Sequence, residues 1–401
     1  MLRLAMVCFE DPRLVSGGVQ RRVAEEIAYF AARGMAITVI TEGPGSPSDA
    51  GGVRYVCVPT PAVPYPLRTL VFSWRASRML KALADFDVVE THHDAGLAVL
   101  LAGLRPGLFV EVVHGVFRDE FDAVCRYGRL AWHSVLASSG LLPLSLFEGL
   151  ACRKADAVVT VSRFGAEQVS RRYNVPRQSI HVISNGIDPR RYRCGAGSRT
   201  AKDTLTVVYV GRWHVRKGVL HLLRAFALAH QAQPRLRLRL IGGGPLESLL
   251  RQETRRLGLS NVVEFAGRLQ DEDVISAYRS ADLVCVPSLQ EGQGIVALEA
   301  QACGAPVVAT QAGGLAEAVC DGQTGILVPP NDIPALAGAI LSLSENERQR
   351  RAMGLNAAEW ARAFTWDGLL APCERLYVQL LARRRLGQKS DTSLGLEARN
   401  V

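Results

Sequence analysis

Residues 205–231 read LTVVYVGRWHVRKGVLHLLRAFALAHQ. The first six, Leu205–Val210, form an apolar run rich in β-branched side chains, which predicts a buried strand. A polar loop with Gly211 and Lys217 follows, and apolar residues then recur at helical spacing from Gly218 to Gln231. A strand, a short loop and a helix in this order are typical of a parallel α/β sheet.

The same order opens the chain. A strand is predicted over Leu2–Phe9, followed by a loop that ends Ser16-Gly17-Gly18-Val19 and by a helix through Arg33 and Gly34. Further strands are predicted at 36–40, 53–58, 87–90, 108–113, 157–161 and 181–183, and, in the second half, at 236–241, 262–265, 283–286, 307–309 and 325–328. The architecture repeats although the sequence does not, so we predict two Rossmann-like parallel-sheet domains.

The boundaries follow from composition. An Arg-, Gly- and Ser-rich stretch over 188–203 predicts the junction, which gives a first domain over 1–193 and a second over 194–365. A last helix is expected from about Trp366 to Arg385. The polar tail over 386–401 has no periodicity and is expected to be disordered.

The composition excludes several classes of protein. The 401 residues are 48% hydrophobic and carry a net charge of +9, which rules out a mostly disordered chain. The basic excess is spread along the chain, so it favours a phosphorylated ligand or an anionic membrane surface over nucleic acid. Nine scattered cysteines without a C-x-x-C pair favour a cytoplasmic protein. The apolar run over 130–147 predicts a buried or surface-lying helix, with peripheral contact at the inner face of a membrane left open.

The segment over 287–300 reads PSLQEGQGIVALEA. It follows an apolar strand, and its glycines, Gly292 and Gly294, allow a ligand to approach the backbone at the start of a helix. Glu291 and Glu299 are eight positions apart, about 12 Å on a helix. This spacing is too wide for paired acid and base catalysis but suits two hydroxyl-bearing parts of an extended ligand.

The loop after residue 210 carries candidate cations. Arg212 has a guanidinium suited to phosphate oxygens, and Lys217 is informative because the chain has only five lysines. Both follow the carboxyl end of a strand, where ligands bind in open α/β sheets. Arg216 is equally well explained as a surface charge.

Three further sets of residues are weaker candidates. Gly17 and Gly18 can bring a phosphate or an acceptor close to backbone N–H groups or can form an ordinary turn. His114 ends an apolar strand, where it can line a cleft, and His92-His93 can lie at the same site or pack structurally. The D-x-D patterns at 85–87 and 271–273 are interpreted as structural, and no metal site is predicted.

These segments together resemble the retaining, metal-independent glycosyltransferases of family 4, whose GT-B fold has two Rossmann-like domains facing across a cleft. The resemblance extends to about residue 385. It rests on an ordered set of motifs: Gly17-Gly18, His114-Gly115, Asn185-Gly186-Ile187-Asp188, Gly211-Arg212, Lys217-Gly218, Gly242–Pro245, Ala266-Gly267-Arg268, the E-x7-E pair Glu291 and Glu299, and Phe364-Thr365-Trp366.

The resemblance implies roles for these residues. Arg212 and Lys217 would grip the diphosphate of a nucleotide-sugar donor, and Glu299 would hold its ribose hydroxyls. Arg268 and Leu269 would meet the base, Gly17 and Gly18 would approach the diphosphate, and His114 would contact the donor sugar or the acceptor. The donor sugar and adjacent phosphate would be held by Glu291 and by the backbone of Gly292, Gln293, Gly294, Ile295 and Val296. Gln293 departs from the family, which has an aromatic residue there.

The resemblance also implies the chemistry. Positive charge at the diphosphate would stabilise the leaving group without a metal cofactor, and the acceptor hydroxyl would attack from the same face, so the anomeric configuration is retained. UDP is the commonest nucleotide in the family, with GDP and ADP left open. The acceptor is a sugar, a lipid-linked envelope precursor or a small metabolite.

Other functions remain in view. A nucleotide-sugar epimerase or a phosphorylase fits the same fold, and a non-catalytic, membrane-associated sugar-nucleotide-binding protein belongs to another class. The four residues Arg212, Lys217, Glu291 and Glu299 argue against the last of these. An oxidoreductase is excluded because the chain lacks a dinucleotide fingerprint.

Overall fold

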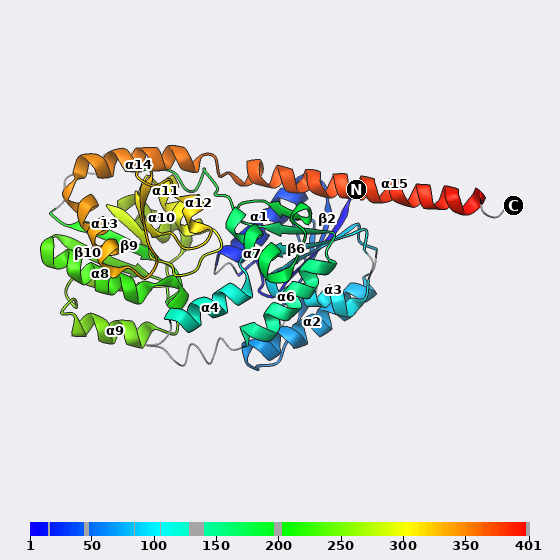
Figure 1. Ribbon diagram of the computed structural model, residues 1–401, viewed down its shortest axis with the longest axis horizontal. Helices are drawn as coiled ribbons and strands as arrows, with labels where there is room; N and C mark the ends of the chain where they lie inside the picture. Colours follow the sequence, from blue (N-terminus) through cyan, green and yellow to red (C-terminus); the bar gives the residue numbers. More distant parts are fainter. Residues whose placement is uncertain are drawn as a thin grey trace. The chain divides into compact units, whose positions relative to one another are not determined.

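The computed structural model describes residues 1–14, 17–43, 48–83, 85–104, 106–127, 140–195 and 203–397. It divides into two compact α/β units, each built on its own sheet (Figure 1). Unit 1 contains residues 1–117, 140–183 and 367–397, and unit 2 contains residues 118–127 and 184–366, within the described ranges. The predicted fold class is confirmed in both units.

Unit 1 is centred on a sheet of order β3-β4-β2-β1-β5-β6-β7-β8, parallel except at the β3–β4 pair. Its strands are β1 (Arg3–Cys8), β2 (Ala36–Glu42), β3 (Ser48–Ala50), β4 (Val53–Val58), β5 (Val88–His92), β6 (Leu108–Val113), β7 (Ala157–Thr160) and β8 (Ile180–Val182). Its helices are α1 (Gly18–Ala32), α2 (Tyr65–Ala82), η1 (His93–Ala95), α3 (Gly96–Ala102), α6 (Leu141–Lys154), α7 (Arg163–Tyr173) and η3 (Arg177–Ser179). The central strands are buried along their whole length, as helices on both faces require.

Unit 2 has a fully parallel sheet of order β11-β10-β9-β12-β13-β14. Its strands are β9 (Leu205–Val210), β10 (Leu236–Ile241), β11 (Val263–Gly267), β12 (Leu283–Val286), β13 (Val307–Thr310) and β14 (Gly325–Val328). Its helices are η4 (Val215–Lys217), α8 (Val219–Ala232), α9 (Glu247–Arg256), α10 (Asp271–Ser280), α11 (Ile295–Ala302), α12 (Leu315–Ala318), α13 (Ile333–Glu345) and α14 (Glu347–Ala361). Helix α4 (Phe117–Tyr127) begins in unit 1, and its remaining residues belong to unit 2.

The predicted strands match the observed ones to within two residues at either end. The sequence analysis missed β3, a three-residue antiparallel edge strand, because so short a segment has no periodicity to detect. The D-x-D patterns are structural where they were expected to be. Asp271–Asp273 form the first turn of α10, and Asp85 and Asp87 both pair with Arg3.

The boundary between the units differs from the predicted one. The chain enters unit 2 at Ser184, about ten residues before the expected position, because Ile187 and Tyr192 are buried in that unit's core. The amide of Ile187 also donates to the carbonyl of Phe364 at 2.7 Å. Residues 118–127, expected in the first domain, likewise group with unit 2, since Tyr127 packs on its core. The first part of the apolar run, residues 130–139, lies outside the described residues. The rest of the run includes the start of α6.

The last helix, α15 (Trp366–Glu397), starts where the sequence predicts and packs on unit 1 (Figure 1). Cys373 and Tyr377 are fully buried, and Tyr29 donates to Glu374 at 3.1 Å. The expectation of a disordered tail from residue 386 is wrong over 386–397, which continue the helix. Extension of a helix already anchored by packing costs little compared with its nucleation, so polar residues can prolong it.

A glycine holds the two central loops of unit 2 together. Gly218, between η4 and α8, has a φ of +64°, and a Cβ at this position would lie 1.8 Å from the carbonyl oxygen of Pro287. Only glycine therefore lets the loop after β9 approach the loop after β12 this closely.

We predict that Gly218→Ala lowers the free energy of unfolding by more than about 2 kcal/mol, from left-handed strain and from the clash with Pro287. Gly258→Ala is the matched control, because Gly258 has a φ of +72° but nothing within 4 Å of its Cβ position. The control should lose only about 1 kcal/mol. Chemical denaturation measures both, and equal losses would show that the contact with Pro287 contributes nothing.

Candidate functional site

The strand order of unit 2 reverses at β9. The chain passes from β9 outward to β10 and β11, and then returns to place β12 on the opposite side of β9. The loops that leave the carboxyl ends of β9 and β12 therefore diverge at a topological switch point, where open α/β sheets bind ligands. The first loop carries Arg212 and Lys217, and the second carries Glu291.

Backbone hydrogen bonds fix these two loops to each other. The carbonyl of Arg216 accepts from the amides of Leu289 at 2.7 Å and of Gln290 at 3.3 Å. Further along, the carbonyl of Glu291 accepts from the amide of Gly314 at 3.1 Å. These bonds set the positions of the charged side chains before any ligand arrives.

Lys217 and Glu291 form an ion pair between the two loops. The ammonium Nζ lies 2.5 Å from Glu291 Oε2, which also accepts from Ser288 Oγ at 3.1 Å. Burial lowers the pKa of Lys217, and the Glu291 carboxylate opposes that shift. Burial would raise the pKa of Glu291, but Lys217 and Arg216 outweigh it and the pKa is lowered. The side chains are 20% and 13% exposed, so a ligand can still reach both.

Arg216, on the same loop, is also held by an ion pair. Its Nε lies 2.9 Å from Glu120 Oε1 on α4, in an ion pair with both side chains about one fifth exposed. The sequence interpretation left Arg216 as a possible surface charge, because its partner lies far away in the chain. Next to it, burial lowers the pKa of His214 to about 4, and nearby Arg216 adds to the effect.

Arg212 is held differently. Its carbonyl accepts from the Tyr209 hydroxyl at 2.9 Å, while its side chain is exposed. Within the described part of the chain, no carboxylate lies within ion-pair distance of this guanidinium, whereas Arg216 and Lys217 are both paired. Arg212 is thus available to an anion at the end of β9.

Helix α11 begins beside these cations. Gly294 caps it with a φ of +88°, and a Cβ there would lie 2.5 Å from Leu315 Cδ1. Gly292, Ile295 and Val296 flank this cap, as the sequence predicts. The first amides of a helix lack intrahelical partners and carry partial positive charge, so this terminus suits phosphate or sugar oxygens.

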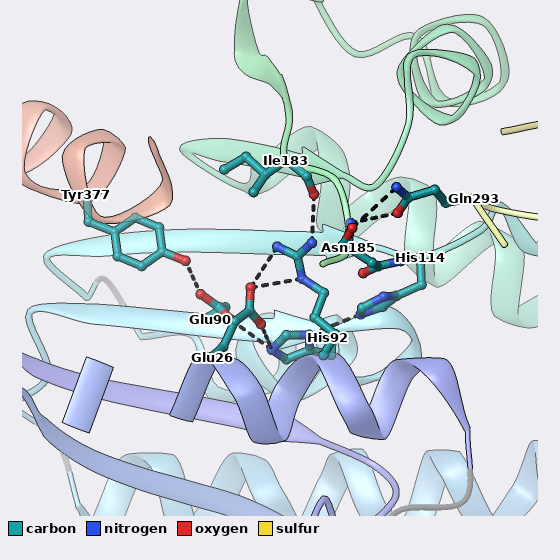
Figure 2. A network of polar contacts seen from close by, with 9 residues as sticks. Glu26, Glu90, His92, His114, Ile183, Asn185, Gln293 and Tyr377 are labelled. Atoms are coloured by element: carbon teal, nitrogen blue, oxygen red, sulfur yellow. Dashed lines mark hydrogen bonds and ion pairs between the residues drawn. The ribbon is translucent and has the colours of Figure 1, made fainter. Parts of the chain in front are cut away.

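Gln293 has a different role from its neighbours. Its side chain is 3% exposed, and its Oε1 accepts from the amide of Asn185 at 2.6 Å (Figure 2). Its Nε2 lies 3.5 Å from the Asn185 carbonyl. The side chain therefore fastens the start of α11 to the Asn185-Gly186 motif. The sequence analysis noted an unusual residue here but had no signal for its partner.

The remaining predicted donor residues also lie in unit 2. Glu299 on α11 is buried, and the Tyr278 hydroxyl donates to its Oε2 at 3.1 Å. Arg268 is exposed after β11, with its Nε 3.5 Å from the Cβ position of Gly243, and Leu269 is partly buried against the core. Their predicted contacts with ribose and base remain predictions.

In unit 1 the strand order reverses at β1. Gly17 caps α1 directly after the loop from β1, and Gly18 is the first residue of that helix. Ser16, which precedes them, lies outside the described residues. His114 follows β6, and His92 ends the neighbouring strand β5. Their rings stack with centroids 5.4 Å apart, and His92 Nδ1 lies 3.1 Å from His114 Nε2.

Comparisons with known proteins show the family of the chain. Residues 196–360 match the family described as "Glycosyl transferases group 1", and residues 16–191 match "Glycosyltransferase Family 4". The D-inositol 3-phosphate glycosyltransferase of Kribbella flavida is 31% identical over 382 residues, 88% of each chain. The chain belongs to glycosyltransferase family 4. The chain spans about half the length of some of the curated relatives it matches, 53% for the protein of the same name from Saccharomonospora viridis.

Solved structures confirm the fold of the chain. Sucrose-phosphate synthase from Thermosynechococcus elongatus matches with a TM-score of 0.83 at 24% identity, over 96% of this chain and 100% of that one. Anabaena HepE, solved with UDP and glucose, matches with a TM-score of 0.70 at 20% identity, over 97% and 100%. Both support the GT-B assignment for the two units.

We predict that Gln293→Leu destabilises unit 2 by about 1–3 kcal/mol, because it removes the buried acceptor of the Asn185 amide. Gln290→Leu is the control on the same loop, at a partly exposed position. Thermal unfolding of both variants is the measurement. A Gln293→Leu protein as stable as the control would show that the bond to Asn185 is not structural.

Proposed function

We propose that this glycosyltransferase moves a sugar from a nucleotide-diphosphate sugar to a hydroxyl acceptor, with retention of configuration and without a metal ion. The observation that carries the proposal is the unpaired Arg212 beside the Lys217–Glu291 pair at the switch point of unit 2. A guanidinium, an ammonium and a helix terminus at one sheet edge form a site for a diphosphate.

The chemistry follows from where charge develops. Cleavage of the bond between sugar and phosphate leaves negative charge on the diphosphate, and Arg212 with Lys217 stabilises it in the transition state. Such preorganised charges are worth several kcal/mol. Glu291, held by Lys217 and Ser288, presents its carboxylate to the hydroxyls of the donor sugar. The acceptor hydroxyl attacks from the face of the leaving phosphate, whose oxygen takes up the proton.

UDP is the proposed nucleotide, supported by the UDP bound in the HepE structure. Glu299 is proposed to hold the ribose hydroxyls, and Arg268 with Leu269 to meet the base. A donor held by these groups needs no cation other than the side chains themselves, which is the basis for proposing a metal-independent reaction.

We expect UDP to raise the melting temperature and EDTA to leave that shift unchanged. Lys217→Ala and Glu291→Ala should each lower transfer from the donor sugar by more than about a hundredfold, because each removes a group that acts at the reacting phosphate or sugar. The anomer of the product, followed by NMR, tests retention.

The matched control is Glu253→Ala, which breaks ion pairs with Arg256 on α9 and Arg224 on α8 in the same unit. This variant should keep near-normal turnover. Turnover by Lys217→Ala at the control's rate would overturn the site assignment. Turnover of donor without any acceptor would instead indicate an epimerase.

A second observation concerns the surface of unit 1. Helix α3 packs against both α2 and α6, and these three helices expose an unusual set of apolar side chains. They are Leu67, Trp74 and Met79 on α2, Leu101 on α3, and Leu146 and Leu150 on α6. No helix in the described part of the chain is long and apolar enough to span a membrane.

The exposed charged residues of these three helices are all basic, although Arg68 pairs with Glu42 outside them. Helix α2 carries Arg68, Arg75, Arg78 and Lys81 and no acidic residue, and α6 ends with exposed Arg153 and Lys154. The one carboxylate of the three helices, Glu148, is buried. Apolar and basic side chains together suit an anionic lipid surface, so we propose that this face contacts a membrane and that the acceptor is lipid-linked.

We expect the protein to sediment with phosphatidylcholine vesicles that contain phosphatidylglycerol and not with phosphatidylcholine alone. Trp74→Ser should weaken this binding at least about threefold, because it removes an interfacial aromatic anchor. Leu355→Ser, at an exposed apolar position on α14 of unit 2, is the control. Equal binding to both kinds of vesicle, or none, would favour a small soluble acceptor.

A further inference from the structure

Unit 1 contains a buried cluster of ionisable side chains next to His114, which the sequence analysis did not detect (Figure 2). Its members come from three elements: Arg22 and Glu26 on α1, Glu90 and His92 on β5, and Tyr377 on α15. All five are 1% exposed or less. Charged groups are almost never buried so completely unless they pair with one another, so the contacts within the cluster define it.

Arg22 neutralises one carboxylate of the cluster. Its Nε and one terminal nitrogen donate to Glu26 Oε1 at 2.9 and 2.7 Å, and the other terminal nitrogen donates to the Ile183 carbonyl at 2.6 Å. Burial raises the pKa of Glu26, although Arg22 opposes the shift. The pair fixes α1 to the end of β8 and leaves Glu26 Oε2 directed at His92.

His92 stands between the carboxylates and His114. Its Nε2 lies 2.8 Å from Glu90 Oε1 and 3.6 Å from Glu26 Oε2, and its Nδ1 lies 3.1 Å from His114 Nε2. The Tyr377 hydroxyl donates to the other oxygen of Glu90. Burial would raise the pKa of Glu90, but the contacts with His92 and the Tyr377 hydroxyl outweigh it, and the pKa is lowered.

A bound metal ion is the alternative explanation, because ligand atoms of Glu26, Glu90 and His92 lie within 4.8 Å of one another. The distances argue against it. Two ligands of a tetrahedral Zn²⁺ lie about 3.3 Å apart, given bonds of about 2.0 Å, whereas His92 Nε2 and Glu90 Oε1 are at hydrogen-bond distance. The positively charged guanidinium of Arg22 also pairs with Glu26, so it already lies where a metal ion bound to this carboxylate would have to be.

We propose that His92, held by Glu90, is a positioning residue that fixes the ring orientation and the tautomer of His114. The proposal rests on the proposed function of His114 at the reacting sugars. In the proposed arrangement a neutral His92 carries its proton on Nε2, which lies 2.8 Å from Glu90 Oε1, and offers Nδ1 only as an acceptor. His114 must then direct its own Nε2 proton to His92, which leaves Nδ1 of His114 with a free lone pair.

This arrangement decides what His114 can bind. Burial lowers the pKa of His114 well below its usual value, so the ring is uncharged. A neutral ring with an unprotonated Nδ1 accepts a hydrogen bond but cannot donate one to a phosphate. His114 is therefore specific for a hydroxyl group of the donor sugar or of the acceptor.

Nitrogen-15 NMR of the histidine rings tests the tautomer directly, without substrate. At about pH 8, well above the ordinary histidine pKa, His114 should show a protonated Nε2 and an unprotonated Nδ1. Its signals are assigned by their loss in His114→Gln. In His92→Phe the two tautomers should become mixed, and His181→Gln, which alters a half-buried histidine of β8 in the same unit, should leave them unchanged.

A wild-type His114 protonated on Nδ1 or on both nitrogens would overturn the proposal, as would an unaltered tautomer in His92→Phe. If His92→Phe does not fold, Glu90→Gln is the second variant, and its His92 and His114 signals should change together. In a functional assay, His92→Phe should lower kcat by about tenfold or more and leave UDP affinity unchanged. The NMR experiment measures the tautomer without substrate, so its result holds even if the protein proves not to be a transferase. Failure of the tautomer proposal can therefore be distinguished from failure of the proposed function.

Discussion

Both units depend on one constraint, the reversal of strand order about a central parallel strand. In unit 2 this strand is β9, and in unit 1 it is β1. Because successive loops leave in opposite directions at such a point, backbone groups and side chains there are free to face a ligand. The charged groups of unit 2 and His92 of unit 1 lie next to these strands, although they come from distant parts of the sequence.

Unit 2 keeps its site charges in place by pairing most of them. Lys217 is held by Glu291 and Arg216 by Glu120, and the backbone of Arg216 fastens the loop after β12. Gln293 fastens the start of α11 in the same way, through Asn185. These contacts fix the loops before a donor binds, so little ordering is required when a diphosphate arrives.

Unit 1 differs from unit 2 because its ionisable side chains are buried. Arg22, Glu26, Glu90 and His92 are desolvated together, and such a cluster contributes less to stability than apolar residues of the same volume can. Its value lies in geometry. Each member has a fixed partner, His92 lies 3.1 Å from His114, and Tyr377 ties the arrangement to α15. The closing helix of the chain therefore supports the interior of the first unit.

The sequence by itself determined the two parallel sheets, the order of their strands along the chain and the positions of the loops with Arg212, Lys217 and Glu291. Those features are local, since apolar periodicity, glycines and a rare lysine can be read within a few residues. The pairs that complete the sites are not local. Asn185 and Gln293 are 108 positions apart, and Glu90 and Tyr377 are 287 positions apart. Nothing near any of these residues in the sequence specifies its partner, so only the tertiary structure decided that Gln293 fastens a loop and that His92 contacts His114.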